Sequence, residues 1–210
     1  MGKVLYINAS PRQGRSHSAA VSGAFVKAYA ASNPGVEVIQ HDLFKMEMPA
    51  MDGLAVQAKY TIMHGQSPTG EEKAAWSEIE RVIADFKAAD KYVFAVPMWN
   101  FSIPYRLKQY LDVIIQPGYT FSFSPDEGYK GLAGGKPVFV AYARGGTYSP
   151  GTPGESMDYQ SKYLETALGF MGFTDIRTVV VEPTVQEGPD VAKAKREAAI
   201  KGAEQMAREF

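Results

Sequence analysis

Residues 3–18 read Lys-Val-Leu-Tyr-Ile-Asn-Ala-Ser-Pro-Arg-Gln-Gly-Arg-Ser-His-Ser, an apolar run that leads through a polar loop into a helical pattern. Residues 4–7 have the β-branched and aromatic content of a strand that is buried on both faces. Over residues 18–31, apolar side chains recur at the three- and four-residue spacing of an amphipathic helix. The stretch therefore predicts a strand, a loop and a helix, which is how an α/β fold begins.

The alternation of strand and helix patterns continues along the chain. Further apolar segments are typical of buried strands, at residues 36–39, 92–96, 138–143 and 177–181. Helical patterns lie between and after them, at residues 71–89, 104–115, 156–171 and 190–209. Thr69 and Glu72 have the spacing of a capping box at the start of the first of these helices. The alternation predicts a doubly wound parallel sheet with right-handed crossovers.

Two stretches break this rhythm. Residues 42–68 are too long for a simple connection and hold four methionines. Residues 118–130 hold four aromatic side chains and predict a small hairpin or flap. Long insertions in an α/β domain are usually functional. We therefore expect a single domain over residues 1–210 with two insertions that serve its function.

Composition excludes several classes of protein. The 22 basic and 23 acidic residues give a net charge of −1, so nothing points to nucleic acid or to a membrane surface. The chain has no cysteine, which excludes disulfides, thiolate metal sites and cysteine nucleophiles. The N-terminal apolar run is too short for a signal peptide, and no apolar stretch approaches the roughly 20 residues that span a bilayer. We expect a cytoplasmic protein.

The loop at residues 8–18 has the features of an anion site. It joins a buried strand to a helix N-terminus, where serine hydroxyls, free amides and the helix dipole favour negative charge, and Arg12 and Arg15 add positive charge. It lacks the Gly-Lys-Ser/Thr of a P-loop, which binds nucleoside triphosphates, and the Gly-x-Gly-x-x-Gly that binds dinucleotides. A terminal phosphate such as that of FMN therefore fits it better. The alternative is an ordinary loop in which Ser16 or Ser18 caps the helix.

Residues 97–104 follow the third predicted strand, at the sheet edge where open α/β folds bind ligands. A flat aromatic cofactor needs an apolar wall and polar groups along one edge. Met98, Trp99 and Phe101 could supply the wall, and Asn100 could fix the edge. The alternative is an aromatic corner of the core.

A third segment, Ala143-Arg144-Gly145-Gly146, follows the fourth predicted strand. Paired glycines let a backbone approach a ligand closely, although they also occur in plain turns. All three segments lie at the carboxyl ends of strands. Their joint occurrence is therefore more specific than any one of them.

Together these segments resemble the FMN-dependent NADH-azoreductase family of flavodoxin-like quinone and azo reductases. The match covers nearly the whole chain and includes the quite specific Met-Trp-Asn-Phe at residues 98–101. It continues through Leu-Lys-Gln-Tyr-Leu-Asp at 107–112, Gly-Tyr-Thr-Phe at 118–121 and Leu-Gly-Phe-Met-Gly at 168–172. The resemblance implies a flavodoxin-like five-stranded parallel sheet of order 2-1-3-4-5, with helices on both faces.

The resemblance also implies a set of FMN-binding residues. The residues of the first loop would hold the phosphate and ribityl chain, those of the second would line the flavin ring, and those of the third would approach its pyrimidine end. The three groups are Ser10, Ser16, His17 and Ser18; Pro97, Met98, Trp99, Asn100 and Phe101; and Ala143, Arg144, Gly145 and Gly146. Phe121 would line the substrate pocket, and Phe170 would reach the site of a partner in a homodimer. Residues 42–68 match the family only loosely.

The implied activity is reduction of quinones and azo compounds by NADH or NADPH, with ping-pong transfer of two electrons through bound FMN. No residue is needed as a nucleophile, and no cluster of side chains indicates a metal site. His41 and His64 are interpreted as structural. Two alternatives stay open: an electron carrier of the flavodoxin type without NAD(P)H turnover, and a non-flavin binding module on the same fold.

Overall fold

Five parallel strands form the central sheet of the computed structural model, which describes residues 2–210. They lie in the order β2-β1-β3-β6-β7, and their bounds are β1 Lys3–Asn8, β2 Glu37–Asp42, β3 Lys91–Pro97, β6 Val138–Ala143 and β7 Ile176–Val181. When the strands of this sheet alone are numbered, the order is 2-1-3-4-5. The predicted α/β topology is thus confirmed.

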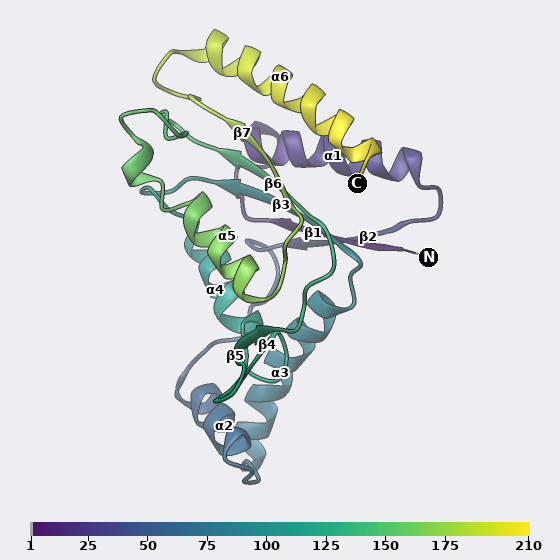
Figure 1. Ribbon diagram of the computed structural model, residues 1–210, viewed down its shortest axis with the longest axis vertical. Coiled ribbons are helices and arrows are strands. Elements are labelled where there is room, and N and C mark those ends of the chain that lie inside the picture. Colours follow the sequence, from purple (N-terminus) through teal and green to yellow (C-terminus); the bar gives the residue numbers. More distant parts are fainter. Residues whose placement is uncertain (1) are drawn as a thin grey trace.

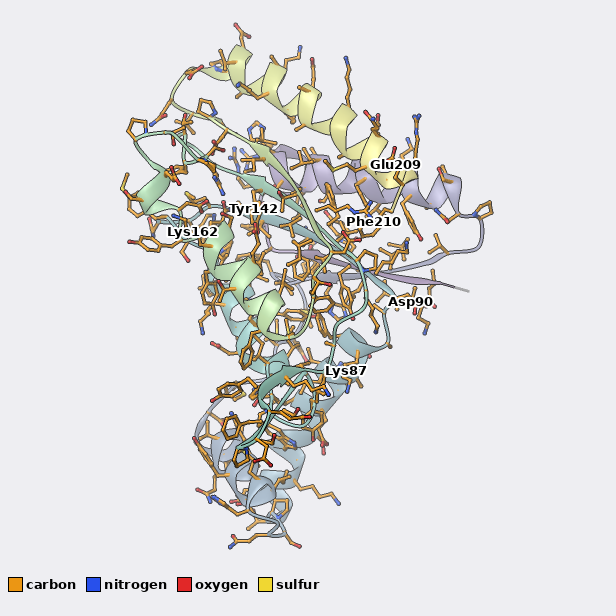
Figure 2. The ribbon with its side chains drawn as sticks, viewed as in Figure 1. Lys87, Asp90, Tyr142, Lys162, Glu209 and Phe210 are labelled. Carbon is orange, nitrogen blue, oxygen red and sulfur yellow. The ribbon has the colours of Figure 1, made fainter. Side chains whose placement is uncertain are left out.

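Helices cover both faces of the sheet (Figure 1). One face carries α1 (His17–Ser32) and α6 (Pro189–Arg208), which pack against each other, and Phe210, labelled in Figure 2, packs against the core beneath them. The other face carries α3 (Gly70–Lys87), α4 (Tyr105–Ile114) and α5 (Ser161–Phe170). The capping box at the start of α3 is present, since Thr69 N donates to Glu72 Oε2 at 2.7 Å and Glu72 N donates to Thr69 Oγ1 at 3.3 Å.

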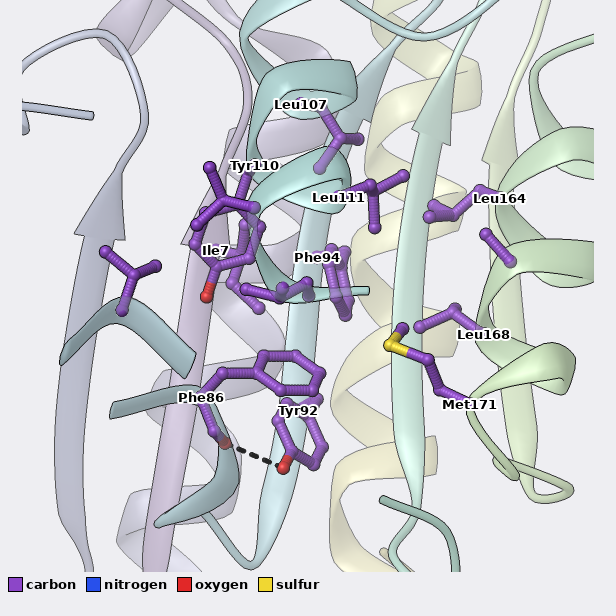
Figure 3. Packing of buried hydrophobic residues seen from close by; sticks show 14 of the residues in the cluster. Ile7, Phe86, Tyr92, Phe94, Leu107, Tyr110, Leu111, Leu164, Leu168 and Met171 are labelled. Atoms are coloured by element: carbon purple, nitrogen blue, oxygen red, sulfur yellow. Dashed lines mark hydrogen bonds between the residues drawn. The ribbon is translucent and has the colours of Figure 1, made fainter. Parts of the chain in front are cut away.

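The central strands build two separate cores because successive side chains of a strand point to opposite faces. In β3, Tyr92 and Phe94 enter the core beneath α3, α4 and α5, whereas Val93 and Ala95 enter the core beneath α1 and α6. Figure 3 shows the first of these cores, in which the Tyr92 hydroxyl donates to the Phe86 carbonyl at 2.8 Å. Burial on both faces is therefore confirmed for β1, β3 and β6.

Burial on both faces was the wrong expectation for the two outer strands. Val38 of β2 is 38% exposed, and β7 is only half-buried over most of its length. Each of these strands lies at an edge of the sheet and pairs with one neighbour only. Neighbouring strands and helices therefore cover less of its surface. An apolar run alone does not distinguish a central strand from an edge strand.

Two predicted helix starts also need correction. The helix predicted from residue 156 begins at Ser161, because Asp158 Oδ1 accepts the amides of Gln160 and Ser161 and residues 155–157 form a short 3₁₀ turn. Pro104, expected in the first turn of α4, is instead its N-cap residue. The interval between residues 143 and 161 is therefore a long loop at the carboxyl edge of the sheet.

Both insertions have structure of their own. Residues 118–130 include the predicted hairpin, with β4 (Phe121–Ser124) antiparallel to β5 (Gly128–Gly131). Residues 42–68 include a helix that was not predicted, α2 (Gly53–Met63), which packs on α3. In Figure 1 both lie below the sheet, on the side away from α6. Between residues 2 and 210, no helix has the length and apolar character needed to cross a bilayer.

Candidate functional site

The ends of β1, β3 and β6 bring the three predicted segments side by side. Asn8 pairs with Ala95, and Pro97 pairs with Ala143, so the three strands end at one edge. Backbone hydrogen bonds continue just past the strands, from Ala9 N to the Ala95 carbonyl at 3.0 Å and from Met98 N to the Ala143 carbonyl at 2.8 Å. The loops that begin at residues 9, 98 and 144 are therefore neighbours.

Ser16 is the N-cap residue of helix α1. Its Oγ accepts the amide of Ala19 at 3.1 Å and lies 3.2 Å from Ser18 Oγ. Both serines are buried. The cap does not exclude an anion, because only two of the four amides at the start of α1 are used, those of Ser16 and Ala19, and the amides of residues 17 and 18 donate to no group within residues 2–210.

Ser10 and His17 supply the clearest sign of a missing partner. Ser10 Oγ and His17 Nδ1 are buried and make no hydrogen bond within residues 2–210. Buried polar atoms in proteins are nearly always paired, so each of these atoms requires a partner from outside the chain. Burial lowers the pKa of His17, and the positive charges of Arg196 and Arg12 lower it further. The same two arginines make the loop attractive to an anion.

Residues 99–102 form a tight turn with unusual backbone angles. Trp99 and Ser102 exchange two backbone hydrogen bonds of 2.9 and 3.0 Å, and the residues between them have positive φ, 46° for Asn100 and 69° for Phe101. Asparagine tolerates this region, but phenylalanine rarely does. Within residues 2–210 the amides of Asn100 and Phe101 donate to no other group. The strained turn thus presents two adjacent free donors at the edge of the sheet.

The side chains of this turn lie among other aromatic residues. The Trp99 ring lies 5.7 Å from that of Phe44 and 6.1 Å from that of Tyr105, and these two rings are 5.8 Å apart. A cavity of about 400 Å³ lies beside Trp99 and Asn100. Sequence reasoning missed Phe44 because it lies in the loosely matching segment 42–68, far from the Met-Trp-Asn-Phe sequence.

The third segment offers its backbone rather than its arginine side chain. The guanidinium of Arg144 is buried and forms ion pairs with Asp158 at 2.7 Å and with Glu182 at 3.2 Å. A Cβ on Gly146 would lie 2.9 Å from Gln186 Nε2, so a larger residue here would have to displace the end of that side chain. Neither acid was predicted, because each is distant in sequence from residue 144 and follows no recognisable motif.

Phe121 and Phe170 meet in a group of four aromatic residues that we call the hairpin aromatic group. Its rings come from Phe121, Phe123, Tyr129 and Phe170, with centroids 4.8–6.1 Å apart in contacting pairs. Phe123 and Tyr129 are more than 60% exposed. The base of the hairpin rests on the turn after α5, where a Cβ on Gly131 would lie 2.3 Å from Gly172 N.

The hairpin aromatic group lies far from the three loops of the same chain. Helix α5 begins beside the loops, since Tyr159, just before it, donates its amide to the Phe101 carbonyl at 3.0 Å. Phe170 is the last of the ten residues of α5. At 1.5 Å per residue the helix separates the two places by about 15 Å. The structure therefore brings Phe121 and Phe170 together but does not join them to the loops.

Comparison with protein families gives a match to the flavodoxin-like fold over residues 2–207. An FMN-dependent NADH:quinone oxidoreductase of Nitratidesulfovibrio vulgaris (strain DP4) is 56% identical over 210 residues, covering 100% of both chains. A protein with the same description from Desulfotalea psychrophila is 46% identical over 94% of this chain and 95% of its own.

Solved structures of similar proteins also superpose on this chain. An azoreductase of Bacillus anthracis str. Sterne superposes with a TM-score of 0.92 at 34% identity and full coverage of both chains. An FMN-dependent NADH-azoreductase of Bacillus anthracis str. Ames Ancestor, solved in complex with FMN, gives a TM-score of 0.87 at 29% identity, covering 99% of this chain and 100% of the other.

Proposed function

Because this chain belongs to the flavodoxin-like fold family, with FMN-dependent NADH:quinone oxidoreductases among its full-length relatives, we propose that it is an enzyme of that kind. It uses NADH to reduce quinones and azo compounds through bound FMN. The observation that carries the proposal is the meeting of three loops at one sheet edge, where Ser10 Oγ and His17 Nδ1 are buried without a partner among residues 2–210.

The residues at this edge fit FMN. Ser10, Ser16, His17 and Ser18 would hold the phosphate, since the loop combines unpaired polar atoms with a helix N-terminus. When bound, FMN supplies the hydride chemistry that no protein side chain provides. Pro97, Met98, Trp99 and Phe101 would line the flavin ring with apolar side chains, and Asn100 would bind its polar edge.

Backbone amides would stabilise negative charge on the flavin. The free amides of Asn100 and Phe101 on one side, and the loop from Ala143 to Gly146 on the other, would donate along the polar edge of the ring. Donors fixed in place before the reaction stabilise negative charge without reorganisation. The strained turn at residues 99–102 holds its two donors in such a fixed arrangement.

We further propose that the enzyme is a homodimer in which Phe121 and Phe170 line the substrate pocket of the partner subunit. In one chain these rings lie about 15 Å from the loops along α5. The exposed side of α2 is rich in large apolar residues, among them Leu54, Tyr60 and Met63. Exposed apolar patches of this kind are typical of protein interfaces. Within each subunit, the whole chain would act as one FMN-binding domain.

An NADH-dependent enzyme needs access to the cytoplasmic pool of that nucleotide, so we expect this protein in the cytoplasm.

Stopped-flow absorbance tests the proposed function. Purified protein is loaded with FMN and mixed anaerobically with NADH, and the loss of flavin absorbance near 450 nm is followed before a quinone is added. We expect bleaching by NADH, recovery with the quinone, and steady turnover without any partner protein. FMN binding without bleaching by NADH or NADPH would instead indicate an electron carrier, and a chain that takes up no FMN would contradict the proposal altogether.

A further inference from the structure

Arg144 is buried although it belongs to one of the loops at the proposed flavin site. Only 3% of the residue is exposed, and each of its three guanidinium nitrogens donates a hydrogen bond within the chain. Nε donates to Gln160 Oε1 at 2.9 Å, Nη1 to Glu182 Oε2 at 3.2 Å and Nη2 to Asp158 Oδ2 at 2.7 Å. The guanidinium is therefore surrounded by protein groups, and any role it has in the site is exerted through them.

One set of these partners leads to the Trp99–Ser102 turn. Gln160, which accepts from Arg144, donates from Nε2 to the Val96 carbonyl at 3.0 Å, two residues before Met98. The neighbouring amide of Tyr159 donates to the Phe101 carbonyl at 3.0 Å. Residues 159–160 thus bond both to β3 just before the strained turn and to the turn itself, and Arg144 bonds to Gln160.

The other set leads to the loop after Gly146. Glu182, which pairs with Arg144, also accepts the amide of Tyr148 on Oε2 at 3.1 Å and the amide of Ser149 on Oε1 at 2.9 Å. The backbone of Arg144 is fixed as well, because its carbonyl accepts from both N and Oγ1 of Thr184 at 2.9 Å. One arginine therefore connects the loops after β3, β6 and β7.

The charges in this cluster make it depend on the arginine. Burial raises the pKa of Asp158, but hydrogen bonds from Ser161 and the charge of Arg144 outweigh burial and leave this pKa below normal. Burial likewise raises the pKa of Glu182, and hydrogen bonds from Ser149 and from the Tyr148 amide, with the charge of Arg144, leave it below normal too. Both carboxyls are thus ionised at neutral pH. Without the guanidinium, two buried negative charges would face each other unpaired, which is strongly unfavourable.

We propose that Arg144 is a positioning residue, which fixes the amides of residues 100–101 and 145–146 relative to each other so that both sets meet one flavin. It acts through Gln160 and Glu182 and makes no contact with the cofactor. The proposal rests on the proposed function, since it presupposes that these loops bind FMN. Arg144, expected among the FMN-binding residues, would thus serve the site by fixing its loops.

The test compares three variants. Arg144→Lys keeps the charge but lacks the planar three-way donor, Arg144→Met removes the charge, and Arg177→Met is the control. Arg177 pairs with Asp175 at 3.0 Å at the opposite end of β7, remote from the loops. For each variant, FMN is titrated at a temperature where far-UV circular dichroism shows a folded chain. The dissociation constant and the visible circular dichroism of the bound flavin are measured.

We expect Arg144→Lys to raise the dissociation constant at least tenfold and to change the visible circular dichroism of the flavin, with a larger effect in Arg144→Met. The dissociation constant of Arg177→Met should stay within twofold of the wild-type value. If Arg144→Met does not fold, the proposal is tested by Arg144→Lys alone. Wild-type affinity and spectrum in Arg144→Lys would overturn the positioning role while leaving the proposed function intact. A wild-type chain that binds no FMN would overturn both.

Discussion

Phe101 has a backbone conformation that a phenylalanine rarely adopts, and its amide is one of the two free amides of the proposed flavin site. Non-glycine residues with positive φ cost of order 1–3 kcal/mol when they are held in strained regions. Strain of this size persists only where the surrounding structure imposes it. Here the two backbone hydrogen bonds between Trp99 and Ser102 impose it. The same tight turn both strains Phe101 and leaves the two amides free.

Replacing Phe101 should separate strain from side-chain contact. Phe101→Gly and Phe101→Ala both remove the ring, but only glycine adopts φ near 69° without steric cost. We expect Phe101→Gly to be about 1 kcal/mol more stable than Phe101→Ala in urea unfolding of the FMN-free protein. Equal stabilities for the two variants would show that the turn is not strained.

His41 should make stability depend on pH. Its Nδ1 lies 3.1 Å from the hydroxyl of buried Tyr110, and burial lowers its pKa, an effect that the Asp85 carboxylate opposes and the Arg81 charge adds to. Because the pKa of His41 in the folded state is below that in the unfolded chain, His41 makes its full contribution to the free energy of unfolding above about pH 6.5. This contribution is lost progressively as the pH falls below that value towards the lower folded pKa.

Thermal unfolding between pH 8 and pH 5 checks this dependence. His41→Asn keeps an acceptor for Tyr110 but cannot be protonated, so its melting temperature should fall less over this range than that of the wild type. His64→Asn, which changes an exposed histidine, is the matched control and should follow the wild type. Identical pH profiles for all three proteins would contradict the assignment to His41.

At the scale of elements, the sheet was predictable because long apolar runs and well-placed helix signals agreed with each other. The capping box of Thr69 and Glu72 is an example. Helix α2 was missed although Asp52 caps it, because its buried positions are small and its large apolar residues are exposed, which inverts the usual amphipathic pattern. The partners of Arg144 were unpredictable for another reason, since ion pairs between distant segments leave no local pattern.

The hairpin offers an element-scale prediction. A Cβ on Gly131 would meet the backbone of Gly172 at 2.3 Å, so Gly131→Ala should shift the hairpin away from the end of α5. Because the hairpin carries Phe121, we expect KM for the quinone to rise severalfold while the affinity for FMN stays unchanged. Gly169→Ala in α5, where an added Cβ meets nothing within 4 Å, should leave both quantities unchanged. A shift in FMN affinity with unchanged KM would contradict this division of roles.

At the scale of the whole molecule, the proposed dimer accounts for features that have no purpose in a single chain. These are the exposed apolar side of α2 and the exposed rings of the hairpin aromatic group. Tyr60→Lys combined with Met63→Lys should yield a monomer in analytical ultracentrifugation, because two charges would then lie in the apolar interface. We expect this monomer to remain folded and to lose most of its quinone turnover. A fully active monomer would contradict a shared site.

In the proposed function, the loops at the ends of β1, β3 and β6 bind FMN, and the first of them binds its phosphate. Parallel titration of the chain with FMN and with riboflavin, followed by flavin fluorescence, tests this binding. Because riboflavin lacks only the phosphate, FMN should bind at least 100-fold more tightly, on the order of 3 kcal/mol. Equal affinities for the two flavins, or no binding of FMN, would contradict this proposal.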